Sequence, residues 1–497
     1  MTTAGATARI RAALEAADFT TDGVAGLLSG PAAAALARHE TVPARRLTGG
    51  GSPLETLVRL FLLQMTLDEK TVSSALPLVD AIAVGILERD GAEVRARLDV
   101  RPYGEAADGD PHWWVVSDPG TGLDGRTVPL RTDHVLGVGG ASTTLAQITA
   151  RRPVGRALDL GTGCGVQALH LSRHANRVIA SDVLPRSLRL TRLTAALSDV
   201  DVELREGSLW DPVEGEELDL VVCNPPFVVS PVGESYTYRD SGLGGDEACA
   251  RLVRGSTAHL APGGRMQLLA NWVHRSGEDW RERVSSWLPD DADALVLQRE
   301  VLDPAEYVAL WLRDAGETGG TDYLERYDTW LAALEEDGVT GVGLGWVSIR
   351  RTDVDRPAHD LREWPHPVEL PLGEELTETM ERSAWLAGTD DDAMLATRFV
   401  VAADVTLESH GEPGAEHPQR LVLRRSRGLR PARVVGTVEA AVVGACGGEL
   451  TVAVILQAVG ALLGQGLQPP DHIAALRTLV REGFLVPVGT VTGHDPV

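Results

Sequence analysis

The stretch from residue 131 to residue 352 alternates strand-like and helix-like patterns, and this alternation constrains the fold more than any other feature of the chain. RALDLG has a continuous apolar face, GVQALHLSRHA has helical periodicity, and RVIASD is again an apolar strand pattern. The same alternation continues to GVGLGWVSIRR at 341–351. Strands that alternate with helices predict a doubly wound α/β domain, here with a sheet of seven strands.

The chain is too long for one hydrophobic core, because 497 residues exceed what a single domain usually contains. We expect an N-terminal domain at 1–130, the α/β domain at 131–355 with a helical insertion near 304–337, and a C-terminal domain at 356–497. Two strand patterns at 93–103 and 112–118 follow three helix-period segments, LETLVRLFLLQM, LDEKTVSSAL and LVDAIAVGILERDG, and this is a winged-helix order. The C-terminal segment, with a hairpin and then three helices and a strand, predicts a second winged-helix-like unit. Each unit is either a nucleic-acid binder or a protein scaffold.

Composition narrows the class of protein. A net charge of −25 disfavours a surface that binds phosphate everywhere, although a local basic groove or the arginine cluster at 420–433 stays open as a docking patch or a solvated hairpin. The four cysteines have no CxxC spacing, which argues against a disulfide framework or a structural zinc site. The N-terminus lacks the apolar core of a signal peptide, and the apolar run at 452–464 is too short to span a bilayer. We therefore expect a cytoplasmic protein that does not enter a membrane.

A glycine turn follows the first strand of the α/β region. In DLGTGCG the residues Gly161, Gly163 and Gly165 alternate, so a ligand can approach the backbone amides without meeting side chains. The spacing differs from the dinucleotide fingerprint, and Asp159 adds a carboxylate suited to an amine. The next strand ends in Asp182, about twenty residues further on, where an acid can accept both hydroxyls of a ribose.

The segment VVCNPPFVVSP at 221–231 ends the fourth strand. The proline pair of Pro225 and Pro226 supplies no backbone N–H, so the strand stops in a stiff corner after Asn224. Taken alone, this corner is either a rigid turn or an active site. In an open α/β sheet, ligands bind at the carboxyl ends of the strands, where this corner and the glycine turn both lie.

These motifs together resemble the class I S-adenosylmethionine-dependent methyltransferases of the NPP[FY] group, over a little under half of the chain. The group includes release-factor glutamine methyltransferases, N6-adenine methyltransferases and guanine-N2 methyltransferases of ribosomal RNA. The resemblance implies a Rossmann-like core that binds S-adenosyl-L-methionine. It implies that the cofactor contacts Asp159, Gly161, Thr162, Gly163, Gly165, Asp182, Ser208, Leu209 and Asn224. Many relatives have an aspartate in place of Ser208, so this chain departs from the family pattern at the adenine contact.

The resemblance also implies a catalytic corner made of Asn224, Pro225, Pro226 and Phe227. The Asn224 side chain and the Pro225 carbonyl would accept hydrogen bonds from a planar NH2 group, and Phe227 would stack against the acceptor. Ser142, Thr143 and Thr144 either bound the pocket or cap a helix. We expect no metal, because His134, His174 and His259 lack ligand spacing and are expected to be surface or packing residues.

Two macromolecular acceptors remain open at this point: a glutamine of a protein of the translation apparatus, and an exocyclic amine of ribosomal or transfer RNA. Two other classes are possible: an inactive methyltransferase core that serves as a nucleic-acid-binding or scaffold protein, and a small-molecule methyltransferase. The sequence does not define the oligomeric state.

Overall fold

The computed structural model describes residues 3–104, 112–120, 123–125, 131–226, 228–229, 245–314, 321–413, 419–464, 467 and 469–489. The chain divides into two compact units. The first contains Met1–Ala146, Arg152–Trp287 and Val301–Gly345, and the second contains Gln147–Arg151, Leu288–Glu300 and Trp346–Val497. None of the helices in these described ranges combines the length and the apolar character needed to cross a bilayer.

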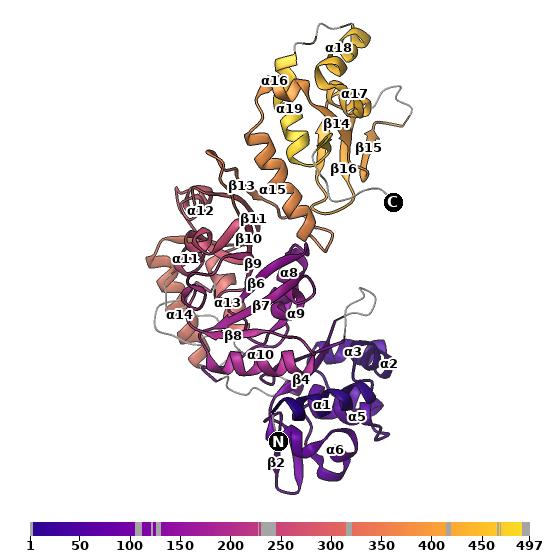
Figure 1. Cartoon of the computed structure of the whole chain (residues 1–497), viewed down its shortest axis with the longest axis vertical. Coiled ribbons are helices and arrows are strands. Elements are labelled where there is room, and N and C mark those ends of the chain that lie inside the picture. The colour runs from indigo at the N-terminus through magenta and orange to yellow at the C-terminus, as the bar shows by residue number, and fades with distance from the viewer. Residues whose placement is uncertain are drawn as a thin grey trace. The chain divides into compact units, whose positions relative to one another are not determined.

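A large, mainly parallel sheet confirms the predicted doubly wound α/β fold (Figure 1). Its strand order is β13-β11-β12-β10-β9-β6-β7-β8. The strands are β6 Val154–Leu160, β7 Ala175–Asp182, β8 Glu203–Glu206, β9 Leu218–Cys223, β10 Leu260–Arg275, β11 Ala292–Leu302, β12 Val339–Arg351 and β13 His359–Glu363. The sheet has one strand more than the seven expected. The additional strand, β13, pairs in parallel with β11, and its sequence HDLRE lacks the apolar alternation that identified the others.

One helix precedes the first strand of the sheet, and helices connect most of the later strands. They are α8 Gly140–Ile148, α9 Val166–Leu171, α10 Pro185–Leu197, α11 Glu247–Gly255, α12 Trp280–Ser285, α13 Pro304–Asp314 and α14 Thr321–Glu336. In α10, Pro185 stands at the first helical position, where its missing N–H costs nothing. Leu188, Leu190 and Leu197 of this helix are buried, and the helix contacts β7 and β8.

The order of the strands creates a switch point beside β6. From β6 the chain proceeds to β7 and then β8 on one side, and it returns to β9 on the other side. The connections from β6 and β9 therefore leave the sheet in opposite directions and open a crevice at the carboxyl ends of these two strands. This crevice positions the candidate site.

The N-terminal part of the first unit contains a series of helices, a three-stranded sheet and a two-stranded sheet. Its helices are α1 Thr3–Ala16, α2 Thr21–Leu27, α3 Gly30–Ala37, α4 Val42–Leu47, α5 Pro53–Leu57, the π-helix η1 Val58–Leu62, α6 Glu69–Ala75 and α7 Leu78–Ala83. Its strands are β1 Leu67–Asp68, β2 Leu87–Asp90 and β3 Glu93–Ala96, in the order β1-β3-β2, and a separate antiparallel pair, β4 Asp99–Tyr103 and β5 Trp113–Ser117.

Two predicted elements of this region were wrong. The strand pattern at 93–103 forms two strands, β3 and β4, which belong to different sheets. LVDAIAVGILERDG was expected to be a single helix, but α7 ends at Ala83 and the same segment continues as strand β2. Gly85 has φ +80°, a left-handed conformation that ends the helix, and Leu87 then pairs with Ala96 in the hairpin.

The C-terminal segment of the second unit contains two three-stranded sheets, ordered β18-β14-β19 and β15-β16-β17. Its elements are α15 Gly373–Ala387, α16 Asp391–Ala396, β14 Arg398–Val401, β15 Val405–His410, β16 Arg420–Arg425, β17 Ala432–Val435, α17 Thr437–Ala445, β18 Gly447–Thr451, α18 Val452–Leu463, α19 Pro469–Arg481 and β19 Leu485–Pro487. The expected hairpin is formed by β15 and β16 alone, because β14 pairs with β18 and β19 instead. Phe399 and Phe484 belong to the hydrophobic core of this segment.

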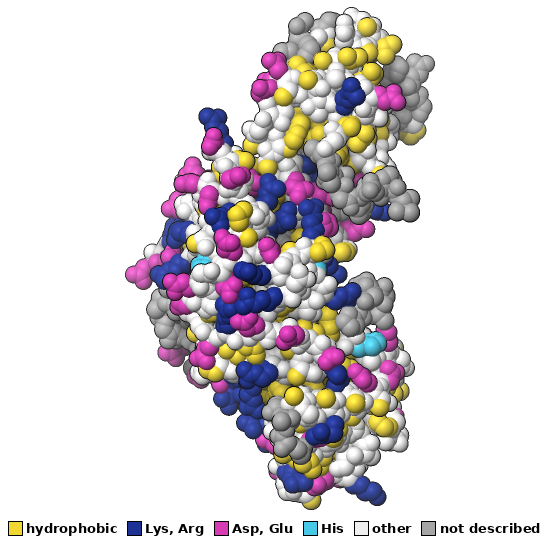
Figure 2. All heavy atoms as spheres, viewed as in Figure 1, with side chains coloured by type: hydrophobic (Ala, Val, Ile, Leu, Met, Phe, Trp, Pro, Cys, Tyr) yellow, Lys and Arg dark blue, Asp and Glu magenta, His cyan; other side chains and the backbone are white. Residues whose placement is uncertain are grey.

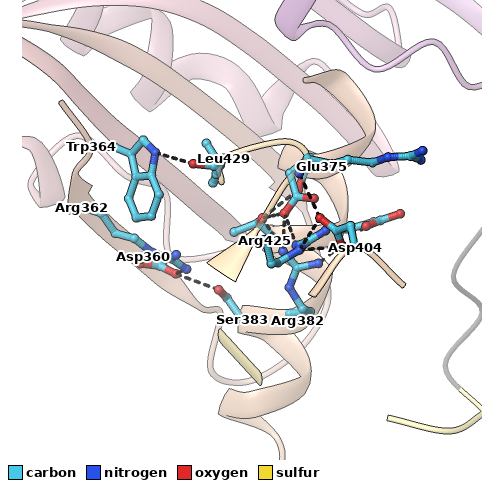
Figure 3. Close-up of polar contacts among 12 residues, drawn as sticks. Asp360, Arg362, Trp364, Glu375, Arg382, Ser383, Asp404, Arg425 and Leu429 are labelled. Atoms are coloured by element: carbon cyan, nitrogen blue, oxygen red, sulfur yellow. Dashed lines mark hydrogen bonds and ion pairs between the residues drawn. The ribbon is translucent and has the colours of Figure 1, made fainter. Parts of the chain in front are cut away.

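A buried ion cluster holds α15 against the strands β15 and β16 (Figure 3). The guanidinium of Arg425 contacts Glu375 at 3.1 Å and Asp404 at 3.1 Å, and Arg382 contacts Glu375 at 2.8 Å. The neighbouring Arg424 pairs with Glu408. Part of the arginine cluster expected at 420–433 is therefore engaged with carboxylates.

Candidate functional site

The register of the central strands brings three predicted residues to one edge of the sheet. Leu160 of β6 lies opposite Ser181 of β7 and opposite Cys223 of β9. The residues that follow these partners are Gly161, Asp182 and Asn224, so all three lie at the carboxyl ends of adjacent parallel strands. The structure thus places the glycine turn, the acid and the Asn-Pro-Pro corner around the switch point.

The glycine turn has a conformation that side chains disfavour. Gly161 has φ +76° and Gly163 has φ +56°, and a Cβ at Gly163 would meet no atom within 4 Å. The amides of Gly161 and Thr162 both donate to the Ser181 carbonyl at 2.9 Å, which fixes the turn to β7. The turn therefore presents bare backbone to an open space.

Asp159 lies beneath this turn and is 2% exposed. Its Oδ2 accepts hydrogen bonds from Thr162 Oγ1 at 2.7 Å and from the Ala168 amide at 3.0 Å. Burial raises the pKa of the Asp159 carboxyl to about 7. A cationic group placed beside this carboxyl would favour its ionised form.

Asp182 ends β7 and joins the glycine turn to the start of α10. Its carboxylate accepts from the Gly163 amide at 3.0 Å and from the Leu184 amide at 2.9 Å. Burial raises the pKa of the Asp182 carboxyl above its ordinary value. Gly207, after β8, donates its amide to the Asp182 carbonyl at 3.1 Å, which brings Ser208 and Leu209 to the same edge.

Asn224 follows β9 and begins the irregular corner. Its Oδ1 atom is buried and has no hydrogen-bond partner among the described residues. The carbonyl of Asn224 lies 3.9 Å from the position that a Cβ on Gly161 would occupy, so the corner and the glycine turn are in contact. A buried amide oxygen without a partner costs free energy, and such an atom is a candidate acceptor for a ligand N–H.

A cavity of about 670 Å³ joins these groups. The predicted residues that line it are Asp159, Gly161, Thr162, Gly163, Asp182, Ser208, Leu209, Asn224, Pro225 and Pro226. The predicted Gly165 is not among the lining residues; it caps α9 with φ +88° and packs against Thr191. Phe227 lies outside the described residues.

One side of the cavity is formed by the segment before α8. His134, Val135 and Ser142 line it, while Thr143 donates its hydroxyl to the Gly139 carbonyl at 3.1 Å. The Asp118 carboxylate, after β5, accepts from the Val135 amide at 2.9 Å and from Arg186 on α10 at 2.9 Å. These bonds connect the lining segment to both the N-terminal part and the α/β core.

The remaining wall comes from residues that sequence reasoning missed: Arg251 on α11 and Leu310, Trp311 and Asp314 on α13. The insertion at 304–337 was recognised as helical, but its distance from the motifs gave no signal that it reaches the cavity. His134 was expected to be a surface or packing residue. It is 6% exposed and lines the cavity, and no cluster of metal-ligating side chains occurs in the described ranges.

The cavity fits a nucleoside with a charged amino-acid tail. Its volume lies within the range typical of small-ligand sites, the glycine turn offers free backbone, and carboxylates at Asp159 and Asp182 suit an amine and a ribose. These features are those that S-adenosyl-L-methionine requires.

Comparison with known proteins agrees with this geometry. Residues 137–278 match the family model described as Methyltransferase small domain. Together with the sheet and the site, this match defines the central region as a class I S-adenosylmethionine-dependent methyltransferase fold. Residues 16–97 and 377–487 match two models, each described as Domain of unknown function, DUF7059 and DUF7782.

The curated relatives match about a third of the chain. Ribosomal RNA small subunit methyltransferase C of Escherichia coli is 29% identical over 178 residues, which cover 35% of this chain and 46% of the relative. The protein of the same name from Yersinia pestis is 27% identical over 180 residues, with the same coverage of 35% and 46%. The match therefore spans about half the length of these relatives.

Solved structures also align with part of the chain. A methyltransferase from Pyrococcus furiosus aligns with 42% of this chain and 82% of its own, at 16% identity and a TM-score of 0.26. An rRNA methylase from Streptococcus thermophilus aligns with 44% of this chain and 100% of its own, at 12% identity and a TM-score of 0.25.

Proposed function

We propose that this chain is an S-adenosylmethionine-dependent N-methyltransferase of the NPP[FY] group that methylates an exocyclic amine of a ribosomal RNA base. The observation that supports this most is Asn224, whose buried Oδ1 has no partner among the described residues and lies at the cavity lined by the glycine turn. An acceptor oxygen in that position suits a substrate NH2 group.

The chain's task in this reaction is to aim a weak nucleophile. The lone pair of an exocyclic amine is delocalised into the ring, so the two N–H groups must be held by acceptors that direct the lone pair outward. Asn224 Oδ1 and the Pro225 carbonyl supply these acceptors. Pro225 and Pro226 keep the corner stiff, and the role of Phe227 as a stacking surface stays a prediction. No general base is required, because the proton leaves after the transfer.

The cofactor supplies an activated methyl group on its sulfonium. We assign its amino-acid end to Asp159 and to the turn of Gly161, Thr162 and Gly163, its ribose to Asp182, and its adenine to Ser208 and Leu209. Gly165 acts through the shape of the turn, since it does not line the cavity.

An RNA acceptor is favoured over a protein glutamine by the relatives, which are named for ribosomal RNA. The net charge of −25 favours the glutamine alternative. On the face drawn in Figure 2, acidic and basic side chains lie interspersed, so RNA would bind through a local site. We keep the glutamine acceptor as an outcome of the test, together with a small-molecule acceptor and an inactive core.

The test uses radiolabelled S-adenosylmethionine with ribosomal particles and total lysate from cells that lack the gene. We expect label in ribosomal RNA that RNase removes and protease does not, and an N-methylated nucleoside by mass spectrometry. Asn224→Ala should lower the transfer rate at least a hundredfold while affinity for S-adenosylhomocysteine stays within a few fold.

The matched control is Asn176→Ala, an exposed asparagine on β7 far in sequence from the motif. It should keep full activity. Label that only protease removes would replace the RNA acceptor with a protein one, and label in small molecules would indicate a metabolic enzyme. Cofactor binding without any transfer would support an inactive core.

A further inference from the structure

The helical insertion between β11 and β12 packs against the segment that follows the Asn-Pro-Pro corner. Helices α13 and α14 contact each other, and their apolar side chains form one core with Val228 and Val229. Both valines are buried, at 5% and 3% exposure. The insertion therefore covers Val228 and Val229.

Two aromatic side chains of the insertion satisfy both polar backbone groups of Val229. The Val229 amide donates to the Tyr307 hydroxyl on α13 at 2.9 Å. The Trp330 indole on α14 donates to the Val229 carbonyl at 2.9 Å. All four groups are buried, where each bond is stronger than in water and a missing partner is costly.

Tyr307 is itself held in place by the sheet. Its hydroxyl accepts a second hydrogen bond, from Asn271 Nδ2 on β10, at 3.1 Å. Its ring is fully buried and meets the Trp330 ring edge to face, with centroids 6.4 Å apart. Tyr307 thus connects Val229 by hydrogen bonds to β10, the strand beside β9, as well as to the insertion.

The next turn of α13 reaches the cavity. Trp311 lies four residues after Tyr307 and meets its ring at a centroid distance of 6.1 Å, and both Trp311 and Leu310 line the cavity with Pro226. Leu310 is 38% exposed, although it is a large apolar side chain. One short helix therefore both holds the segment after the corner and offers an apolar wall beside it.

We propose that α13 and α14 form an acceptor-positioning element: Tyr307 and Trp330 hold Val229, and with it the Asn224 corner, while Leu310 and Trp311 form the wall against which a flat nucleobase lies. This inference rests on the proposed function for the identity of the acceptor. Tyr307 and Trp330 are positioning residues, because they act through Val229.

The positioning part is tested with Tyr307→Phe, which keeps the ring and removes the acceptor of the Val229 amide. The matched control is Tyr327→Phe on α14, whose exposed hydroxyl donates to the Ala305 carbonyl at 2.7 Å within the insertion. Hydrogen–deuterium exchange of peptides that contain Val229 should become at least tenfold faster in Tyr307→Phe and stay unchanged in Tyr327→Phe.

Kinetics of the same variants separate positioning from general destabilisation. With ribosomal RNA from cells that lack the gene, kcat of Tyr307→Phe should fall at least tenfold, while affinity for S-adenosylhomocysteine stays within twofold. Trp330→Phe, which removes the other bond to Val229, should behave alike. Unchanged exchange together with unchanged kcat in Tyr307→Phe would overturn the inference.

The wall is tested with two leucines of the insertion. Leu310→Ala should raise KM for ribosomal RNA at least fivefold with a smaller change in kcat, whereas Leu324→Ala, which is 67% exposed and outside the cavity lining, should leave both unchanged. Equal KM values for Leu310→Ala and the wild type would contradict the proposal that Leu310 forms a wall for the nucleobase. If the wild type methylates protein instead, the proposed function fails, but the exchange experiment and the same comparison with that acceptor still decide the inference.

Discussion

The hydroxyl of Thr162 donates a hydrogen bond of 2.7 Å to the Asp159 carboxylate, at the point where β6 becomes the glycine turn. The bond ties the turn to the strand, but two donors do not compensate for the loss of water around this buried carboxyl. Asp159 is therefore poised between its neutral and charged forms near neutral pH, and a cationic amine would shift it to the charged form.

We expect the stability of the ligand-free protein to carry a contribution from Asp159 that is lost as the pH rises. The native pKa is about 7, above the ordinary value of 3.8, so the native state binds this proton more tightly than the unfolded chain does. The contribution is full below about pH 3.8, disappears by about pH 7, and amounts to about 4 kcal/mol at most. Asp159→Asn removes it.

Thermal melts of the wild type and Asp159→Asn at pH 5 and pH 8 measure this effect. The variant should gain stability relative to the wild type as the pH rises. Comparing the two proteins at each pH cancels the other titrating groups. A difference in Tm that does not depend on pH would contradict the raised pKa.

Two glycines of the turn should respond differently to alanine. Gly163 has φ +56° and open space at its Cβ position, so Gly163→Ala should cost only the left-handed conformation, about 1–2 kcal/mol. Gly165 has φ +88°, and its Cβ would lie 3.0 Å from Thr191 Cγ2, so Gly165→Ala should cost at least about 1 kcal/mol more. Urea unfolding measures both. Gly51→Ala, with φ +82° and open space, is the control for the conformational cost. Equal losses of unfolding free energy in Gly163→Ala and Gly165→Ala would show that the Thr191 side chain moves aside at little energetic cost.

The sequence predicted those parts of the site that depend on local order along the chain. Asp159 lies at the end of an apolar strand, and Gly161 and Asn224 each follow one. Parallel strands bring their carboxyl ends to one edge, so the meeting of these residues could be inferred without coordinates. The contact of Tyr307 with Val229 spans 78 residues and depends on how a helix pair packs, for which periodicity has no signal. Strand β13 was missed for a related reason, because its pairing with β11 comes from the backbone and not from apolar side chains.

Neighbouring arginines in β16 offer a matched test of buried and exposed ion pairs. The side chain of Arg425 is 8% exposed and contacts Glu375 and Asp404, whereas that of Arg424 is 46% exposed and contacts Glu408. Removing Arg425 leaves Asp404 without its cation in a buried place and leaves Glu375 with Arg382 alone, so Arg425→Ala should lower the free energy of unfolding by about 3–5 kcal/mol. Arg424→Ala should cost at most about 1 kcal/mol. Urea unfolding followed by far-UV circular dichroism compares them, and similar losses would mean that the cluster of Figure 3 is solvated in solution.

Asp118 should control the affinity of the cavity through the segment that contains His134 and Val135. Burial opposes its charge, but the hydrogen bonds from Arg186 and from the Val135 amide outweigh burial and lower the pKa of the carboxyl. Asp118→Ala removes both bonds and leaves the Val135 amide unpaired, so the segment should detach from its anchor and affinity for S-adenosylhomocysteine should fall about tenfold. Asp133→Asn is the control, because Asp133 lies in the same segment and forms an ion pair with the exposed Arg131. Isothermal titration of both variants decides the matter. If Asp118→Ala binds S-adenosylhomocysteine as tightly as the wild type does, the Asp118 anchor does not shape the cavity. If Asp133→Asn loses as much affinity as Asp118→Ala, the effect comes from charge and not from the anchor.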